Sequence, residues 1–378
     1  MRPAFLALVD ANISPYSRCI MTIALLAVAL AFQGPREIPN RIDCARCTIQ
    51  LTQVATLGRD LSEWPTMISE DRRGRYYVTQ PNKRELPAIF DATGRRVGTL
   101  GAEGEGPGEF RRAAVIAVDP QTDSIFVTDW GIPRLSVFSP QWKFVRSFPF
   151  PGSALVLGVL RNRHLAAMAT ITDRASIGLP FHIFQRDGQR TKTIGDPTRP
   201  YMRGREMFFP HWLAASRRGG FWAVPQWGEY RIEHWTVNGV RDVYLRRRPA
   251  WYTAREPSGD MGDPLTMESP PSLHLGVAEA ENGLLWVVTR VADPGRRRAA
   301  LDTLRNVEGR YVVARNWDQV WDSVVELIDP DRGVVVAAQR FDEMFHLMVL
   351  PSGKVVHIKD TESGIEARIL KFSLSRGS

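Results

Sequence analysis

The sequence predicts an all-β fold, specifically a six-bladed β-propeller with four-stranded blades. Two observations lead to this fold class. A pattern of short apolar strands separated by turn residues recurs six times, and a strand near the N-terminus matches the one missing from the last repeat. Many short strands at regular spacing, closed into a ring, are typical of β-propellers.

The most regular part of the repeat is a short apolar strand that ends in an aromatic or aliphatic residue and runs into a turn. Its copies are residues 88–90, 136–138, 182–184, 233–235, 326–328 and 369–372. Upstream of each copy lies a second segment rich in β-branched or aromatic residues. These segments are 75–80, 124–129, 164–170, 220–226, 284–290 and 354–360. Glycine-containing turns precede several of them, and a further apolar run stands before those turns, so each repeat supplies the strands of one blade.

The period of the repeat separates this fold from helical arrays. The first repeats recur at about fifty residues, which suits four-stranded blades rather than ankyrin or tetratricopeptide units. No sustained helical periodicity competes with the strand pattern outside one insertion, residues 292–319 of the fifth blade. Its segment 296–305 could form a short helix with a cationic face that covers the channel, meets an acidic partner or is only a solvated excursion.

The ends of the chain predict how the ring closes. The sixth repeat has three strands before the chain reaches Ser378, and residues 50–57 supply the missing outer strand. The ending Ala55-Thr-Leu-Gly58 resembles Gly98-Thr-Leu-Gly101, the end of the first blade's outer strand. Pairing the two ends would remove exposed sheet edges, which otherwise invite aggregation.

The first residues are typical of a targeting segment. Arg2 and Arg18 precede an apolar run over residues 20–32, and Ala29-Leu-Ala31 is a cleavage signal. The run is short for a transmembrane span. We expect a signal peptide at 1–31, a linker at 32–47 and a single propeller domain at 48–378, in a protein exported to the periplasm or beyond. Whether the segment is cleaved or kept as an anchor stays open.

Two cysteines, Cys44 and Cys47, lie in the linker with C-x-x-C spacing. This spacing suits a redox pair, half of a zinc site or a haem attachment. Thr48 stands where haem attachment needs a histidine, and no second Cys or His pair lies nearby for zinc. In an oxidising compartment we expect a local disulfide between them.

The composition suits a folded domain with a basic surface. Of 378 residues, 44% are hydrophobic and 24% are charged, which argues against wholesale disorder. Lys and Arg outnumber Asp and Glu by 49 to 41, so an acidic protein, peptide or glycan partner is favoured. The excess is spread along the chain, which indicates a solvated basic surface rather than a nucleic-acid face.

The loop from Gly101 to Phe110, with sequence GAEGEGPGEF, resembles the NHL-repeat-type six-bladed propellers. The resemblance is strongest to exported bacterial members that carry C-x-x-C ahead of the first blade. Glycines there would allow positive φ and close approach, and Phe110 would anchor the loop between blades. The resemblance implies a binding scaffold, a hydrolase or a lyase, so it gives a fold and not a reaction.

Three histidines occupy the same place in successive repeats, namely His211, His274 and His346. Each opens the innermost strand of its blade, so all three would face one end of the central channel. Three imidazoles with an open position suit catalytic Zn²⁺. The arrangement is similar to the peptidylglycine-amidating lyase propeller, although no motif assigns the Tyr and Arg which that enzyme also needs. The alternative is that each histidine caps its strand by a hydrogen bond to a loop.

The loops between second and third strands combine aromatic and charged side chains that suit sugar or peptide recognition. The candidate ligand-binding residues are Asp129, Trp130, Arg134, Trp227, Glu229, Arg231, Lys359 and Asp360. The alternative is that Trp130 and Trp227 only wedge between blades. Such interleaving also suits nucleic acid, which export disfavours.

Two function classes therefore remain open. The favoured one is an exported binding or scaffold propeller that uses its channel mouth. The other is a metal-dependent lyase or hydrolase of the zinc type. Whether the protein is an enzyme stays open at this stage.

Overall fold

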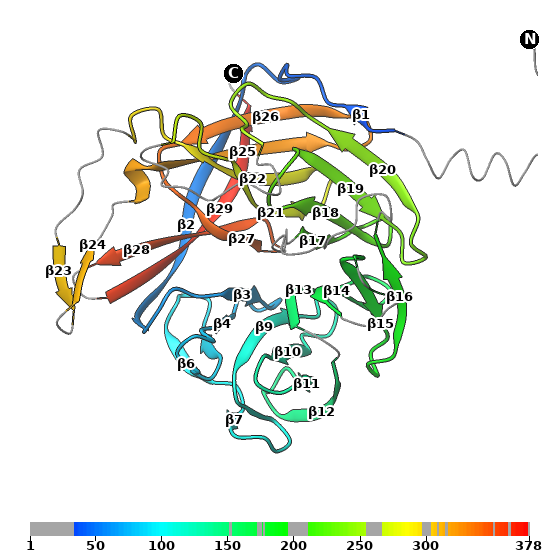
Figure 1. The fold of residues 1–378 in the computed structure, drawn as a ribbon, viewed down its shortest axis with the longest axis vertical. Coiled ribbons are helices and arrows are strands. Elements are labelled where there is room, and N and C mark those ends of the chain that lie inside the picture. The colour runs from blue at the N-terminus through cyan, green and yellow to red at the C-terminus, as the bar shows by residue number, and fades with distance from the viewer. Residues whose placement is uncertain are drawn as a thin grey trace, which may run out of the picture.

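The computed structural model is a ring of six four-stranded antiparallel sheets around a central axis, as Figure 1 shows. It describes residues 34–150, 153–171, 176, 178–195, 211–254, 267–296, 304–307, 310–313, 317–350, 352–361 and 364–376. The predicted six-bladed β-propeller is confirmed. The expected signal peptide lies outside the described residues. No helix in the described ranges is long and apolar enough to cross a membrane.

The first three blades follow one another along the chain. Blade 1 is β3 (Met67–Glu70), β4 (Tyr76–Thr79), β5 (Ala88–Phe90) and β6 (Arg96–Thr99). Blade 2 is β9 (Ala113–Val118), β10 (Ile125–Asp129), β11 (Arg134–Phe138) and β12 (Phe144–Pro149). Blade 3 is β13 (Ser153–Val159), β14 (Leu165–Thr170), β15 (Phe181–Phe184) and β16 (Arg190–Ile194).

The other three blades carry the additions to the pattern. Blade 4 is β17 (His211–Ala215), β18 (Phe221–Pro225), β19 (Arg231–Trp235) and β20 (Arg241–Arg246), with β1 (Arg36–Glu37) added at its edge. Blade 5 is β21 (Leu273–Glu279), β22 (Leu285–Ala292), β25 (Trp321–Asp329) and β26 (Val334–Phe341). Blade 6 is β27 (His346–Leu350), β28 (Lys354–Thr361), β29 (Gly364–Arg376) and β2 (Cys47–Leu61).

The core lies between blades, where residues of the repeated third strand pack. Phe90, Phe138 and Phe184 end β5, β11 and β15, and all three are at most 1% exposed. Phe138 stacks on Phe110 from the loop between blades 1 and 2, with ring centroids 5.8 Å apart. The aromatic position identified in the sequence is therefore the packing residue that joins neighbouring blades.

The ring closes through the chain ends, as predicted. In Figure 1 the blue β2 lies beside the red β29. The antiparallel register places Leu51 opposite Phe372 and Leu57 opposite Ala367. The strand is longer than the predicted 50–57, because it begins at Cys47 and reaches Leu61.

The segment ahead of β2 runs along the outer edges of two further blades. β1 pairs in parallel with the end of β20, and Ile42 bridges to Val335 of β26. The backbone N–H of Cys44 donates to the carbonyl of Val336 at 3.1 Å. Cys44 and Cys47 form a disulfide, which confirms that prediction and places the link beside the closing strand.

The glycine-rich loop has the conformation that its residues suggest. Gly101 has a φ of +78°, and a Cβ there would lie 2.5 Å from the carbonyl oxygen of Gly108. The short strands β7 (Ala102–Glu103) and β8 (Glu109–Phe110) pair in parallel within the loop. Phe110 is 3% exposed, so it anchors the loop in the core.

The insertion in blade 5 differs from its predicted form. β23 (Leu304–Val307) and β24 (Arg310–Val313) form an antiparallel hairpin, followed by a 3-10 turn at Trp317–Gln319. The possible helix over 296–305 is wrong at its C-terminal end, because Leu304 and Arg305 belong to β23 and pair with Val313 and Val312. Residues 297–303 lie outside the described ranges. Cross-strand pairing overrides the helical spacing at this end.

Candidate functional site

The residues that the sequence singles out all lie towards one end of the ring. We call this end the mouth face, defined by the starts of the inner strands and the connections between second and third strands. His211 and His346 are the first residues of β17 and β27, and His274 is the second residue of β21.

Asp129, at the end of β10, is engaged entirely in local structure. Its carboxylate accepts hydrogen bonds from the backbone N–H groups of Arg111, Arg112, Gly131 and Ile132, at 2.7–3.1 Å. The side chain is buried, and its residue is 5% exposed. Four amide donors saturate the two carboxylate oxygens, so this group shapes the loop between blades.

The neighbouring candidates on blade 2 are also engaged in packing. The indole N–H of Trp130 donates to the carbonyl of Ala154 in blade 3 at 3.1 Å, and the Arg112 guanidinium lies over its ring. Arg134 donates to the carbonyls of Glu105 and Glu109 and so holds the glycine-rich loop. Trp130 therefore contacts blade 3, and its role in ligand binding stays a prediction.

On blade 4, His211 and Arg231 contact each other instead of a shared ion. A guanidinium nitrogen of Arg231 lies 3.2 Å from His211 Nε2, and Phe181 packs edge-on against the imidazole. Arg231 also lies 3.6 Å from the carboxylate of Glu233. The arginine places a positive charge where a metal ion would have to bind His211, which opposes such binding.

The remaining sequence candidates are scattered around blades 4 to 6. Trp227 packs against the core between blades 5 and 6, and Glu229 lies 3.9 Å from Arg246. Lys359 lies 3.9 Å from Asp318. Asp360 belongs to β28, and its side chain lies outside the described set.

His274 is enclosed by aromatic rings. Tyr252 stacks on the imidazole at 5.2 Å, and Tyr230 meets it edge-on at 4.6 Å. Nδ1 lies 2.8 Å from the hydroxyl of Thr289, whereas the buried Nε2 has no hydrogen-bond partner. Burial lowers the pKa of His274 to about 3, so the imidazole is neutral at physiological pH.

A buried ion pair lies beside this aromatic group. Arg247 pairs with Glu326 of β25, and the Tyr230 hydroxyl donates to the same carboxylate at 2.6 Å. All three residues are at most 4% exposed. Blade 4 is thereby joined to blade 5 through a desolvated charge pair. The residue pattern contained no signal for this pair, because its members lie 79 positions apart.

His346 has the opposite surroundings, with charged groups nearby. The backbone N–H of Ile358 donates to Nδ1 at 3.0 Å, and Trp64 meets the ring edge-on at 4.6 Å. Because Nδ1 accepts this bond, the proton of the neutral imidazole is on Nε2. That buried Nε2 has no hydrogen-bond partner. Burial lowers the pKa of His346 to about 3; the neighbouring His357 and Arg290 act in the same direction, and Asp318 opposes them.

Arg290, near the end of β22, is a residue that sequence reasoning missed. Its guanidinium lies 4.5 Å above the ring of Trp321, and its buried Nε has no hydrogen-bond partner. Burial lowers the pKa of Arg290 to about 10, so the group remains charged at neutral pH. An arginine inside the apolar segment 284–290 was the one signal that could have identified it.

The three histidines do not form a ligand set in the described ranges. Those ranges contain no group of three or more His, Cys, Asp or Glu side chains that could hold a metal ion. His346 also presents the wrong tautomer, because a histidine that binds a metal through Nε2 normally donates through Nδ1. Its Nδ1 instead faces the N–H of Ile358.

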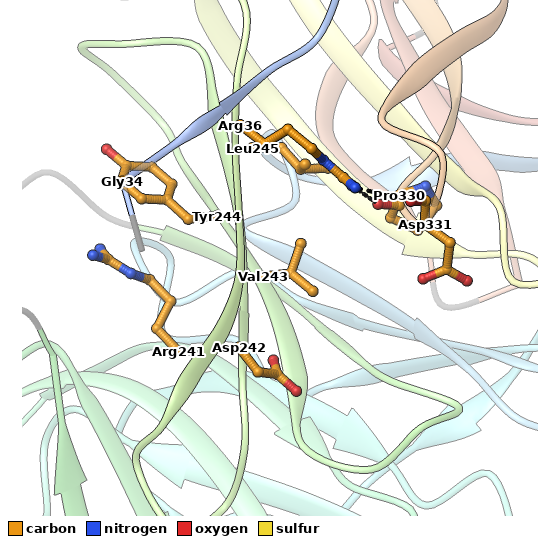
Figure 2. A pocket seen from close by; sticks show the side chains of 9 residues that line it. All are labelled: Gly34, Arg36, Arg241, Asp242, Val243, Tyr244, Leu245, Pro330 and Asp331. Atoms are coloured by element: carbon orange, nitrogen blue, oxygen red, sulfur yellow. Dashed lines mark hydrogen bonds between the residues drawn. The ribbon is translucent and has the colours of Figure 1, made fainter. Parts of the chain in front are cut away.

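A pocket elsewhere on the molecule contains the Arg36 side chain, which forms hydrogen bonds within the protein. It lies along β20 beside β1 and is lined by Arg36, Arg241–Leu245, Pro330 and Asp331, among others. Figure 2 shows the Arg36 guanidinium turned towards Pro330. Arg36 donates to the backbone carbonyls of Pro330 and Asp331, which attaches β1 to the turn of blade 5.

Comparisons with known proteins agree with the fold. A family described as 6-bladed beta-propeller matches residues 67–158. No curated protein matches this sequence. The structure is similar to that of a Bacteroides fragilis protein thought to be exported, with a TM-score of 0.56, 11% identity, and coverage of 91% of this chain and 99% of that chain. It is also similar to a DUF4221-family protein of Bacteroides vulgatus, with a TM-score of 0.58, 10% identity, and coverage of 87% and 99%.

Proposed function

We propose that this six-bladed propeller is an exported binding protein of the NHL-repeat type that recognises its ligand at the mouth face of blades 4–6. One observation carries the proposal. His274 and His346, at equivalent places in successive blades, each end in a buried ring nitrogen without a partner. Buried polar atoms are normally hydrogen-bonded, so two exceptions at equivalent places of the channel mouth favour a ligand there.

The surroundings of these nitrogens support recognition rather than packing alone. Tyr230 and Tyr252 enclose His274, and Trp64 lies against His346. Aromatic walls with a few directed polar atoms suit sugar or peptide ligands. On blade 2, by contrast, Asp129 and Trp130 have their hydrogen-bonding groups engaged within the protein.

The alternative function, a zinc-type lyase or hydrolase, requires His211, His274 and His346 to share one ion. The contacts of Arg231 with His211 and of Ile358 with His346 argue against it. Export itself is supported by the Cys44–Cys47 disulfide, since such links persist in oxidising compartments.

Binding of glycan and peptide arrays by the purified chain tests the proposal. We expect a ligand whose binding survives chelation, is lost in the His274→Phe, His346→Phe double variant and is retained in Trp130→Phe. Trp130→Phe is the matched control because it changes a mouth-face aromatic on blade 2. Stoichiometric zinc in the protein, lost together with binding in His274→Phe, would instead establish the metal-dependent alternative.

A further inference from the structure

Arg290 has no acidic partner, unlike two other arginines of blades 4–6. Arg247 pairs with Glu326, and Arg340 with Asp322. Within the described ranges the Arg290 side chain forms no ion pair and donates no hydrogen bond. Its guanidinium lies over the ring of Trp321. A desolvated charge without a counter-ion is destabilising, so such an arginine at the mouth favours binding of an anion.

His346 adds a second donor beside this cation. Its Nδ1 accepts the N–H of Ile358, so Nε2 carries a hydrogen that no acceptor receives. Arg290 lies over Trp321, and Trp64, which meets His346 edge-on, packs against the cluster that contains Trp321. Both donors therefore border one aromatic cluster between blades 5 and 6. A guanidinium and an imidazole N–H are both donors, so their common ligand must be an acceptor, and the positive charge favours an anion.

Two acidic side chains of this region, Asp318 and Asp322, have cationic neighbours other than Arg290. Asp318 accepts from His357, with both carboxylate oxygens 3.3 Å from Nε2, and from the backbone N–H of Met344 at 2.8 Å. Lys359 lies 3.9 Å from the same group. Asp322 accepts from Arg340 through Oδ2 at 2.5 Å, whereas its buried Oδ1 has no hydrogen-bond partner. The cations beside Asp318 and Asp322 are thus Lys359 and Arg340, and Arg290 forms no ion pair with either carboxylate.

The aromatic side chains around Arg290 and His346 indicate the kind of molecule that carries the anionic group. Trp321 lies under the guanidinium, and Trp64 meets His346 edge-on and packs against the small cluster of Val320, Trp321 and Met344. Such apolar surface suits a carbon skeleton. A single full positive charge balances one negative charge, which matches a carboxylate and not a doubly charged phosphate.

We propose that Arg290 and the Nε2–H of His346 bind the carboxylate of an organic acid whose carbon skeleton packs against Trp64 and Trp321. The sources with this chemistry are acidic sugars and the C-terminal ends of peptides. The inference rests on the proposed binding function. It names the class of ligand that binds the part of the mouth face formed by blades 5 and 6.

Isothermal titration of the full chain with matched pairs of probes tests this assignment. The pairs are glucuronate against glucose, and N-acetylphenylalanine against its amide. Inorganic phosphate is the third arm. We expect the acid of one pair to bind at least tenfold more tightly than its neutral partner, and the pair that responds identifies the source.

Variants of Arg290 give the decisive comparison. Arg290→Met should weaken binding of that acid by about 30-fold or more, because it removes one member of a desolvated charge pair. His346→Phe should weaken it by about three- to tenfold, the size expected for a neutral hydrogen bond. Arg111→Met is the matched control, because it removes an exposed arginine from the mouth face of blade 2. Arg290→Lys keeps the charge and guards against a folding defect in Arg290→Met.

The outcomes separate this inference from the function it rests on. If neutral partners bind as well as the acids and Arg290→Met changes nothing, the carboxylate assignment is overturned while binding at the mouth stands. Preference for phosphate also overturns it. If glycan and peptide arrays and all these probes fail to bind the intact chain, both proposals fall.

Discussion

Leu51 lies opposite Phe372 in an antiparallel pair, so a residue from the start of the propeller completes a sheet made by its last three strands. The register continues along β2 to Leu57 opposite Ala367. The ring is therefore held by non-covalent pairing between segments more than 300 positions apart. The site on blades 4–6 depends on this closure, because β27 belongs to the sheet that the pairing completes.

Leu57→Ala should destabilise the whole propeller. Leu57 is fully buried in the closing strand, so its truncation leaves a cavity and should cost about 2–5 kcal/mol of unfolding free energy. Val54→Ala on the same strand is the control. Val54 is 38% exposed, and its change should stay within about 0.5 kcal/mol. Chemical denaturation followed by tryptophan fluorescence measures both, and equal effects would argue against the seam as the closing element.

Loss of the Cys44–Cys47 disulfide should have a modest effect. The link closes a very short loop, so it restrains the unfolded chain by about 1–2 kcal/mol. We expect reductant to lower the unfolding midpoint of the protein and to leave the Cys44→Ser, Cys47→Ser double variant unchanged. A large loss, or an effect of reductant on the double variant, would contradict a purely local restraint.

The buried pair Arg247–Glu326 should behave as a coupled unit. Arg247→Met leaves a buried carboxylate without its cation, at a cost of about 3–5 kcal/mol. Adding Glu326→Leu should recover most of this loss, with about 1–3 kcal/mol remaining for the Tyr230 hydroxyl that loses its acceptor. Additive losses in this double-mutant cycle would show that the two side chains do not interact.

Asp129 should matter for stability and not for ligand binding. Asp129→Ala leaves four backbone amides between blades 1 and 2 without their acceptor and should cost about 3 kcal/mol or more. Asp331→Asn is the control, because the Asp331 side chain is 72% exposed and its pair with Arg218 is worth less than about 1 kcal/mol. A folded Asp129→Ala protein with tenfold weaker ligand binding would restore Asp129 to the site.

His274 should make stability fall on acidification. Its folded pKa of about 3 lies below the unfolded value of 6.5, so the unfolded chain binds more protons between these values. The contribution of the neutral His274 imidazole to the free energy of unfolding is fully present above pH 6.5. It is lost at about 1.4 kcal/mol per pH unit as pH falls towards 3. His274→Phe should reduce the slope of unfolding free energy against pH by that amount. Equal slopes in the two proteins would show that the folded imidazole protonates normally.

The strand repeat and its aromatic positions could be predicted from the sequence because each depends on local chemistry. Alternating apolar residues, turn glycines and the position of Phe90, Phe138 and Phe184 are properties of single blades. Closure was also predictable, since residues 50–57 repeat the ending of an outer strand. The C-x-x-C spacing indicated the disulfide because a link across so few residues needs no knowledge of the fold.

The contacts of the candidate site could not be predicted from the sequence, because they form between blades. The sequence by itself determined that His211, His274 and His346 lie at the start of inner strands, which is a fact of register. Only the tertiary structure decided that Arg231 and the N–H of Ile358 approach two of these imidazoles, and that Arg290 reaches the mouth without an acidic partner. Side chains from different strands meet only after the ring closes, so no local pattern records their charge balance.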